Sequence, residues 1–292
     1  MQGELMQPRT FRFATVAALA PTAQAWQGIA TRAEELGYST LLTPDTMTTM
    51  EPFTALSAAA ARTERLRVGT FVLPAPFYTP SEIAWRSLSL DLLSGGRFDL
   101  GLGAGRPDAE TEVVHRERAF GSPAERVKQL SNAIQIVKEE MTAAAGGRSL
   151  LKPVQRPHPP ILVAAAGRRM FQLAAAEADI VTLGLDPRTD EEGLAAKVAE
   201  LRAIAGSRFD DLEISFNLSG VGTDLPDFLR HQMGVDPAEL IRSGAPAILT
   251  GTPQEMADTL RRRRDELGIS YIAVNGMFLE QFAPVVELLA GT

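Results

Sequence analysis

Cysteine is absent from the 292-residue chain, and histidine is scarce. Without cysteine there are no disulfides, thiolate zinc sites, iron–sulfur clusters or cysteine nucleophiles. The three histidines, His115, His158 and His231, lie far apart, and no H-x-x-x-H spacing predicts a metal site. A G-x-S-x-G elbow is also missing, so a serine hydrolase has no visible nucleophile. We therefore expect neither a bound metal nor hydrolase chemistry.

Basic residues are fewer than acidic ones: 29 lysines and arginines against 36 aspartates and glutamates give a net charge of −7. A protein this acidic has no overall attraction to nucleic acid or to an anionic membrane. No run approaches the roughly 20 apolar residues of a membrane helix. The polar N-terminal residues 1–10 lack the apolar stretch of a signal peptide. The sequence thus predicts a cytoplasmic protein that binds neither nucleic acid nor membrane.

Short apolar runs alternate with longer helical stretches, which is typical of βα units and a parallel sheet. The predicted strands are residues 11–18, 38–43, 66–73, 98–102, 161–165, 180–183, 212–218 and 270–274. The predicted helices are 22–36, 53–63, 81–93, 123–141, 169–177, 190–205, one that starts at the capping box 252–255, and 278–289. Eight strands and eight helices in strict order favour a closed (β/α)8 TIM barrel, an α/β fold, over an open doubly wound sheet.

We expect a single domain over residues 1–292, with an irregular or short-helical insertion at residues 219–250 at the barrel mouth. The proline-rich connector at residues 153–160 could instead mark a domain boundary, but the βα alternation resumes directly after it. Pro74-Ala75-Pro76 cannot continue a helix or a central strand, so it is predicted to be a loop.

In such a barrel the active site lies where the strands end, so the residues at the strand ends are the candidates. The second strand ends in Thr43-Pro44-Asp45-Thr46. Asp45 would face the mouth and accept a hydrogen bond from a cofactor N–H or hydroxyl. It could equally well cap a turn or the next helix, and the sequence leaves both interpretations open.

Glycines mark the third and fourth strands. Gly69, inside the third strand, indicates either a bulge with close backbone approach or plain packing. The fourth strand ends in Gly101-Leu102-Gly103-Ala104-Gly105, with glycine at every second position. These small residues could leave room for a planar ring or a phosphate. The spacing is not the dinucleotide fingerprint G-x-G-x-x-G, because Arg106-Pro107 follows instead of a helix.

The fifth strand ends in Ala164-Ala165-Ala166-Gly167, and Arg168-Arg169 begins the next helix. Small residues that lead into a helix N-terminus form a phosphate site, because the backbone N–H groups point outward and the helix dipole favours an anion. The alternative is an ordinary loop with surface arginines.

Acids, bases and nucleophiles are poorly represented at the strand ends. Carboxylates are plentiful on the predicted helices, but no pair stands out at the mouth. A site of this kind suits a reaction whose difficult step belongs to a cofactor. The sequence assigns no catalytic residue.

Several stretches resemble the luciferase-like monooxygenase superfamily. Residues 66–73 (LRVGTFVL) are similar to its third-strand motif, and residues 91–105 (DLLSGGRFDLGLGAG) resemble its most specific stretch. Residues 33–38 (AEELGY) and 251–255 (GTPQE) match further blocks. The resemblance runs from about Phe11 to the C-terminus, nearly the whole chain.

Within the superfamily the sequence is most similar to the actinobacterial coenzyme F420-dependent oxidoreductases. This resemblance implies hydride transfer between a deazaflavin, lying across the barrel mouth, and a small organic substrate. FMN is the alternative cofactor. The resemblance also assigns residues: the peptide bond Phe71–Val72 is cis and backs the ring, Asp45 contacts the ring or its linker, Gly103, Ala104 and Gly105 pass close to the ring, and Ala165, Ala166, Gly167 and Arg168 hold the phosphate.

Two positions depart from the members that oxidise a sugar phosphate. Those members carry His after the strand-two Asp and Glu after the strand-four glycines, whereas this chain has Thr46 and Arg106. The departure puts sugar-phosphate oxidation in doubt and leaves no transferable acid or base. An FMN-dependent two-component monooxygenase and a non-catalytic flavin-binding protein of the same fold are the alternatives. A homodimer is a further expectation.

Overall fold

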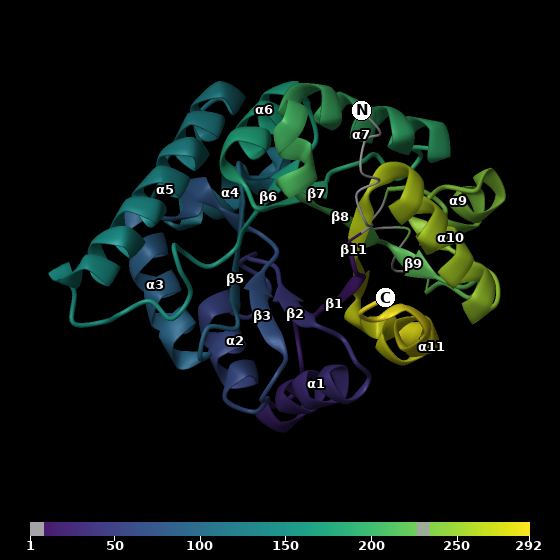
Figure 1. Ribbon diagram of the computed structural model, residues 1–292, viewed down its shortest axis with the longest axis horizontal. Coiled ribbons are helices and arrows are strands. Elements are labelled where there is room, and N and C mark those ends of the chain that lie inside the picture. Colours follow the sequence, from purple (N-terminus) through teal and green to yellow (C-terminus); the bar gives the residue numbers. More distant parts are fainter. Residues whose placement is uncertain (1–8, 227–229, 231–233) are drawn as a thin grey trace, which may run out of the picture.

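The computed structural model describes residues 9–226, 230 and 234–292 (Figure 1). In these ranges eight parallel strand positions close into a barrel, because the split third strand pairs with both neighbours. The strands around the barrel are β1 (Arg12–Val16), β2 (Thr40–Thr43), β3 (Arg67–Thr70) with β4 (Leu73–Pro74), β5 (Phe98–Gly103), β6 (Ile161–Ala165), β7 (Ile180–Leu183), β8 (Glu213–Leu218) and β11 (Ile269–Asn275). The prediction of a (β/α)8 barrel is confirmed.

Helices surround the barrel on the outside (Figure 1). Those that follow strands in the expected order are α1 (Ala23–Glu35), α2 (Pro52–Ala60), α3 (Pro80–Leu93), α5 (Pro123–Ala143), α6 (Arg168–Glu177), α7 (Glu191–Ala205), α10 (Pro253–Leu267) and α11 (Leu279–Leu289). In the described residues no helix is both long and apolar enough to cross a membrane.

Local sequence signals explain where several helices start. Thr79 and Ser122 form reciprocal capping boxes with Glu82 and Glu125, and Thr252 forms a third box at the start of α10. In each case a proline follows the cap, where its missing N–H costs no hydrogen bond. The predicted starts of these helices therefore agree with the structure to within one residue.

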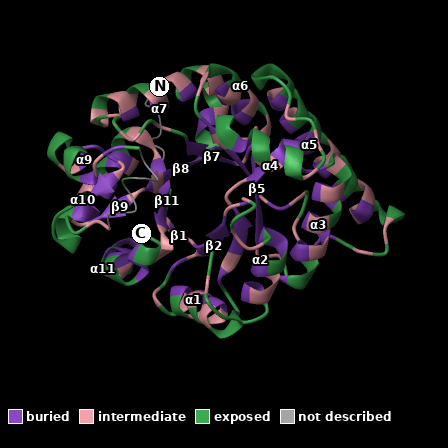
Figure 2. Cartoon of the chain, turned by 180° about the vertical axis from the view of Figure 1, so that it is seen from behind, coloured by how far each residue is buried: buried purple, intermediate pink, exposed green. Residues whose placement is uncertain are grey.

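Two apolar layers hold the barrel together. The larger one lies between the strands and the outer helices, and Figure 2 shows the buried strands inside a partly exposed helical shell. The smaller one fills the barrel interior, and its buried members are Ala14, Leu42, Leu162, Ile180, Tyr271 and Ala273. The side chains of Val16, Phe71 and Val72 pack on this inner cluster and are only partly buried. The inner cluster thus supports the residues that lie above it at the mouth.

Three details differ from the sequence prediction. Strand three is not continuous over residues 66–73, because it breaks after Thr70 and resumes at Leu73. The segment from Pro74 is not a loop: Pro74 pairs with Gly103 as part of β4, and η1 (Ala75–Phe77) is a 3-10 turn. Proline is tolerated here because the strand is only two residues long and lies at the end of the pairing.

A short helix after β5 was not expected. It consists of η2 (Pro107–Ala109) and α4 (Glu110–His115). Its few residues show too little apolar periodicity to be recognised.

The insertion predicted at residues 219–250 contains a small parallel pair of strands, β9 (Gly220–Val221) and β10 (Ile248–Leu249), and helix α9 (Pro237–Ser243). Within the described part of this segment, α9 is thus a short helix beside a two-stranded pair. Residues 227–229 and 231–233, and with them His231, lie outside the described residues. The assignment of residues 1–292 to one domain stays a prediction.

Candidate active site

A cavity of about 260 Å³ opens at the carboxyl end of the barrel. Among the described residues it is lined from the bulged strand by Phe71 and Val72, from β6 to β8 and the loops after them by Ala164, Thr182, Leu183, Gly184, Leu185, Asp186, Pro187, Thr189, Phe216, Asn217 and Ser219, and from the insertion by Pro246 and Ala247. This is the end of the barrel at which such folds place their active sites.

One wall of the cavity is a bulge between β3 and β4. Gly69 pairs with Asp99, and the next pair along the strands is Leu73 with Leu102. Between these two pairs the bulged strand advances by four residues, from Gly69 to Leu73, while β5 advances by three, from Asp99 to Leu102. The bulged strand therefore carries one extra residue. The peptide bond Phe71–Val72 within the bulge is cis, as the resemblance implied. The role of this segment in backing a ring stays a prediction.

The glycines of β5 accommodate the bulge. A Cβ on Gly101 would lie 1.9 Å from the backbone oxygen of Thr70, and a Cβ on Gly103 would lie 2.7 Å from a methyl group of Val72. The Thr70 hydroxyl bridges the break in the ladder: it donates to the carbonyl of Gly101 and accepts from its N–H, both at 2.8 Å. The space at Gly101 is thus taken by the protein's own backbone, whereas Gly103 faces a side chain that also lines the cavity.

The remaining residues of this stretch are set by loop geometry. Gly105 has a φ of +83°, a conformation that favours glycine. The carbonyl of Ala104 accepts a hydrogen bond from Arg126 at 3.2 Å. Close approach of Gly103, Ala104 and Gly105 to a cofactor ring is not tested by these contacts.

The opposite wall is polar. In the barrel order, β8 lies four strands from the bulged strand in either direction, directly across the mouth. Glu213, Ser215 and Asn217 alternate on the inner face of β8. Asn217 lines the cavity, and its carboxamide oxygen is buried without a hydrogen-bond partner. Thr182 of β7, which pairs with Ser215, lies beside it on the same wall.

These polar residues were not predicted from the sequence, whose candidate site residues all lie on the second to fifth predicted strands and the loops after them. The alternation in Glu213-Ile214-Ser215-Phe216-Asn217 was the available signal, because a polar residue at every second position of a buried strand needs a reason.

Asp45 is almost fully buried, 3% exposed, and both of its carboxylate oxygens are hydrogen-bonded. The Tyr78 hydroxyl donates to one oxygen at 2.7 Å, and the Arg116 guanidinium donates to the other at 2.8 Å. Arg116 also lies over the ring of Phe77, 4.3 Å from its centroid. Asp45 does not cap α2, because Glu51 does. Through its ion pair with Arg116, Asp45 instead connects the loop after β2 to the segment that follows α4.

Burial raises the pKa of Asp45, although the hydrogen bond from Tyr78 and the charge of Arg116 oppose that rise. The same burial, together with the neighbouring carboxylate, raises the pKa of the Tyr78 hydroxyl. Contact between Asp45 and a cofactor stays a prediction, and it would have to add to the two bonds already made.

The two departures from the sugar-phosphate pattern have structural partners. Thr46 donates its hydroxyl to the hydroxyl of Thr49 at 3.1 Å. Arg106 pairs with Asp108 at 2.9 Å and with Glu112, whose other oxygen accepts from the backbone N–H of Met47 at 2.8 Å. These contacts fasten α4 to the loop after β2 and supply no acid or base at the cavity.

At the proposed phosphate seat, Gly167 is the N-cap of α6, and a Cβ there would meet nothing within 4 Å. Ala165 is buried behind the strand, while Ala166 is exposed. The exposed side chain of Arg168 lines a groove between α6 and α7 on the outside of the barrel, together with Gln172. Phosphate binding by this segment stays a prediction.

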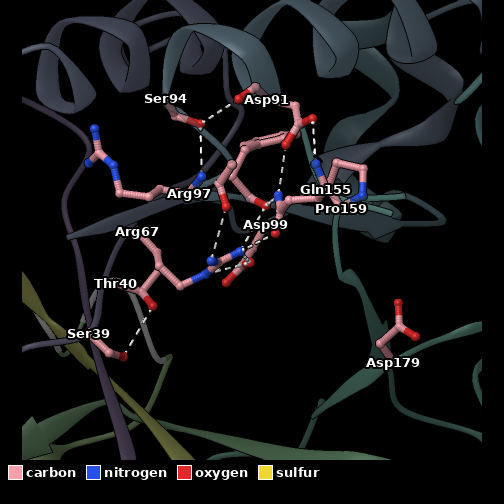
Figure 3. A network of polar contacts seen from close by, with 12 residues as sticks. Ser39, Thr40, Arg67, Asp91, Ser94, Arg97, Asp99, Gln155, Pro159 and Asp179 are labelled. Atoms are coloured by element: carbon pink, nitrogen blue, oxygen red, sulfur yellow. Dashed lines mark hydrogen bonds and ion pairs between the residues drawn. The ribbon is translucent and has the colours of Figure 1, made fainter. Parts of the chain in front are cut away.

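Within residues 91–105, the stretch that carries the strongest family resemblance, Asp91 and Asp99 belong to a network of polar contacts (Figure 3). Asp91 accepts from the backbone N–H groups of Val154 at 2.6 Å and Gln155 at 3.2 Å, and from the Gln155 side chain at 2.9 Å. Asp99 pairs with Arg67 and with Arg12, the latter at 3.0 Å. Asp91 therefore anchors the proline-rich connector, and this half of the motif supports the fold.

No group of three or more histidine, aspartate or glutamate side chains that could hold a metal ion occurs in the described part of the chain.

A closed barrel with a cavity at the carboxyl ends of its strands is the arrangement of many barrel enzymes. Residues 10–268 match the family model of the luciferase-like monooxygenases, and the chain belongs to this family.

Its relatives use different cofactors. The oxygenase component of the flavin-dependent trigonelline monooxygenase of Acinetobacter baylyi is 30% identical over 130 residues, 42% of this chain and 36% of that protein. The F420-dependent glucose-6-phosphate dehydrogenase of Kribbella flavida is 27% identical over 289 residues, 88% of this chain and 83% of that protein.

A solved structure shows the same fold. The coenzyme F420-dependent tetrahydromethanopterin reductase of Methanopyrus kandleri superposes with a TM-score of 0.72 at 15% identity, covering 97% of this chain and 99% of the other. The chain therefore shares its family with both F420-dependent oxidoreductases and flavin monooxygenases.

Proposed function

We propose that the protein transfers a hydride between coenzyme F420 and a small organic substrate. The observation that carries this proposal is the mouth cavity, which has the bulged Phe71–Val72 segment on one wall and Asn217 on the wall across from it. A flat apolar wall facing a polar one suits a planar ring with a substrate against its free face.

The residues of the cavity fit such a ring. Val72, Ala164 and Gly184 are small or apolar and leave a slot rather than a filled core. A volume of about 260 Å³ lies just below the ~300–1,000 Å³ typical of ligand pockets, so we expect the inner part of the ring system to enter while its tail lies over the rim.

We assign the anionic tail to the first turn of α6. Gly167 leaves open space in front of the free N–H groups of that turn, and the helix dipole favours an anion there. The exposed guanidinium groups of Arg168 and Arg169 add positive charge nearby.

When bound, the deazaflavin supplies a carbon that accepts or releases hydride. The chain's own part is orientation: Phe71 and Val72 support one face of the ring, and the inner apolar cluster beneath them excludes water from that face. Asp45, held by Tyr78 and Arg116, keeps the loop after β2 in place at the rim.

The second candidate is an FMN-dependent monooxygenase, which the similarity to the trigonelline enzyme favours. Fluorescence titration of the cofactor-free protein with F420 and, separately, with FMN distinguishes the two. We expect F420 to bind at least tenfold more tightly, a difference of about 1.4 kcal/mol. Equal affinities, or a preference for FMN, would transfer the assignment to the monooxygenase.

The same titration tests whether the anionic tail of the cofactor binds at the first turn of α6. Replacing Gly167 with leucine places a side chain in front of the helix N-terminus, where an added Cβ would meet nothing within 4 Å, so Gly167→Leu should fold normally and bind F420 at least tenfold more weakly. Normal affinity in a folded Gly167→Leu variant would place the phosphate elsewhere.

A homodimer and a cytoplasmic location also stay predictions. Analytical ultracentrifugation of the purified protein tests the first, and fractionation of the source cells tests the second.

A further inference from the structure

Two polar side chains on β8 each have a buried oxygen that is unpaired in the described part of the chain. The Ser215 hydroxyl and the Asn217 carboxamide oxygen are both buried and make no hydrogen bond among the described residues. Buried polar groups in native proteins are nearly always paired, so an unpaired one at a binding site indicates a partner supplied from outside the chain. Ser215 lies two residues before Asn217 on the same face of β8, but of the two only Asn217 lines the cavity.

The strand register gives the neighbours of the two residues. Asn217 pairs with Ala273 of β11 across one strand boundary, and Ser215 pairs with Tyr271 and Thr182 on its two sides. The nearest wall across the barrel is the apolar pair Phe71 and Val72. A molecule in the cavity could supply the partner that the carboxamide oxygen of Asn217 lacks among the described residues.

We propose that Asn217, assisted by Thr182, binds the oxygen of a small uncharged alcohol or carbonyl substrate and so determines substrate specificity. This inference rests on the proposed function, because it takes the bulge wall as the place of the ring and leaves the wall of β8 for the substrate. A carboxamide offers two N–H donors and a carbonyl acceptor, and a hydroxyl both donates and accepts. The unpaired carboxamide oxygen can accept from the O–H of an alcohol, and the carboxamide N–H groups can donate to the oxygen of an alcohol or of the corresponding carbonyl compound.

The charge of the cavity favours an uncharged molecule. Among the described residues that line it, none is lysine, arginine or histidine. The one acid, Asp186, is exposed, and one of its oxygens accepts the backbone N–H of Arg188 at 2.8 Å. A carboxylate or phosphate would lose its hydration here without gaining a cationic partner. An uncharged hydroxyl or carbonyl group loses much less hydration free energy on entering the cavity.

Calorimetry with matched probes tests the proposal. Cyclohexanone is the uncharged probe, and cyclohexanecarboxylate is the anionic one on the same ring. Both are titrated into cofactor-free and F420-loaded protein. The variant Asn217→Leu removes both hydrogen-bonding groups at similar size, and Asn132→Leu makes the same change at an exposed position on α5, far from the cavity lining.

We expect cyclohexanone to bind with a millimolar or lower Kd, and cyclohexanecarboxylate at least tenfold more weakly. Asn217→Leu should weaken cyclohexanone binding at least tenfold while its affinity for F420 changes less than twofold. Asn132→Leu should behave like the parent protein.

Three results would overturn the inference: no cyclohexanone binding by the parent protein, equal binding by Asn217→Leu, or tighter binding of the carboxylate. Loss of F420 affinity in Asn217→Leu would do so as well, because it would assign Asn217 to the cofactor. If the parent protein bound neither F420 nor FMN, the proposed function would fail, whereas the titration of cofactor-free protein would still decide the role of Asn217.

Discussion

At the scale of single residues, the glycines Gly101 and Gly103 of β5 are required for different structural reasons. Gly101 has the Thr70 backbone oxygen directly where its side chain would be, and Gly103 has only a Val72 methyl group there. A backbone oxygen inside a barrel cannot move without breaking the bulge, but a valine side chain can change rotamer. Gly101 therefore preserves the fold, and Gly103 preserves the shape of the cavity.

Replacing Gly101 or Gly103 with alanine distinguishes the two roles. Gly101→Ala should lower the free energy of unfolding by about 3 kcal/mol or more, since the overpacked atom is backbone, and Gly103→Ala by only about 1 kcal/mol. Gly103→Ala should also weaken F420 binding, because it pushes Val72 into the cavity. Urea denaturation measures the first effect and fluorescence titration the second. A Gly101→Ala protein as stable as the parent would show that the bulge can relax.

Sequence alone could predict some of these residues and not others. The strand-end rule singled out Asp45, Gly103 and Gly167, but of the predicted site residues Phe71 and Val72 are those that line the cavity. The rule could not show that Asp45 is already bound by Tyr78 and Arg116, since Arg116 follows a helix that has no clear sequence signal. The cis peptide bond came only from the resemblance, because nothing in the propensities of Phe71 or Val72 favours it.

At the scale of the elements, one carboxylate ties α1 to the start of β3. Glu34, near the end of α1, accepts the backbone N–H groups of Glu64 at 3.1 Å, Arg65 at 2.6 Å and Leu66 at 2.7 Å. Burial opposes ionisation of Glu34, but the hydrogen bonds from Arg65, Leu66 and Glu64 outweigh it and lower the pKa. The turn at residues 64–66, directly before β3, thus depends on the charged side chain of Glu34 from α1.

The stability of this link should depend on pH. A carboxyl group whose pKa is lower in the folded state stabilises the protein above its ordinary pKa of 4.5, and this stabilisation disappears as the pH falls through the folded-state pKa. Glu34→Gln should therefore lower the free energy of unfolding by about 1–2 kcal/mol at pH 7, with a smaller difference from the parent at pH 4.

Glu35→Gln is the matched control, because Glu35 is exposed and pairs only with Arg32 on the surface. It should be nearly neutral at both pH values. Denaturant unfolding at the two pH values measures each difference. A Glu34→Gln difference that did not shrink on acidification would show that charge is not the cause.

Elements with strong local signals were predicted well. The bounds of β6 and β7 agree with the sequence prediction, and the capping box at residues 252–255 located the start of α10. The break in strand three was not predicted, because one extra residue in a buried apolar run does not change the pattern of residue types. The register against β5 reveals it.

At the scale of the whole molecule, the number of strands determines what faces what. In a ring of eight, the bulged third strand and β8 are four positions apart in both directions. The strand count was predictable from the βα alternation, so the opposition of these two strands was available from the sequence. Which of their side chains lack partners was not, since that depends on three-dimensional packing around Ser215 and Asn217.

The most direct test of this account is a crystal structure of the protein with bound F420. We predict that the ring lies against Phe71 and Val72, about 3.5–4 Å from their nearest carbon atoms, with its tail at the first turn of α6. Asn217 should face the opposite side of the ring, leaving space for a substrate. A ring bound outside the mouth cavity, for example in the groove lined by Arg168 and Gln172 between α6 and α7, would contradict the account.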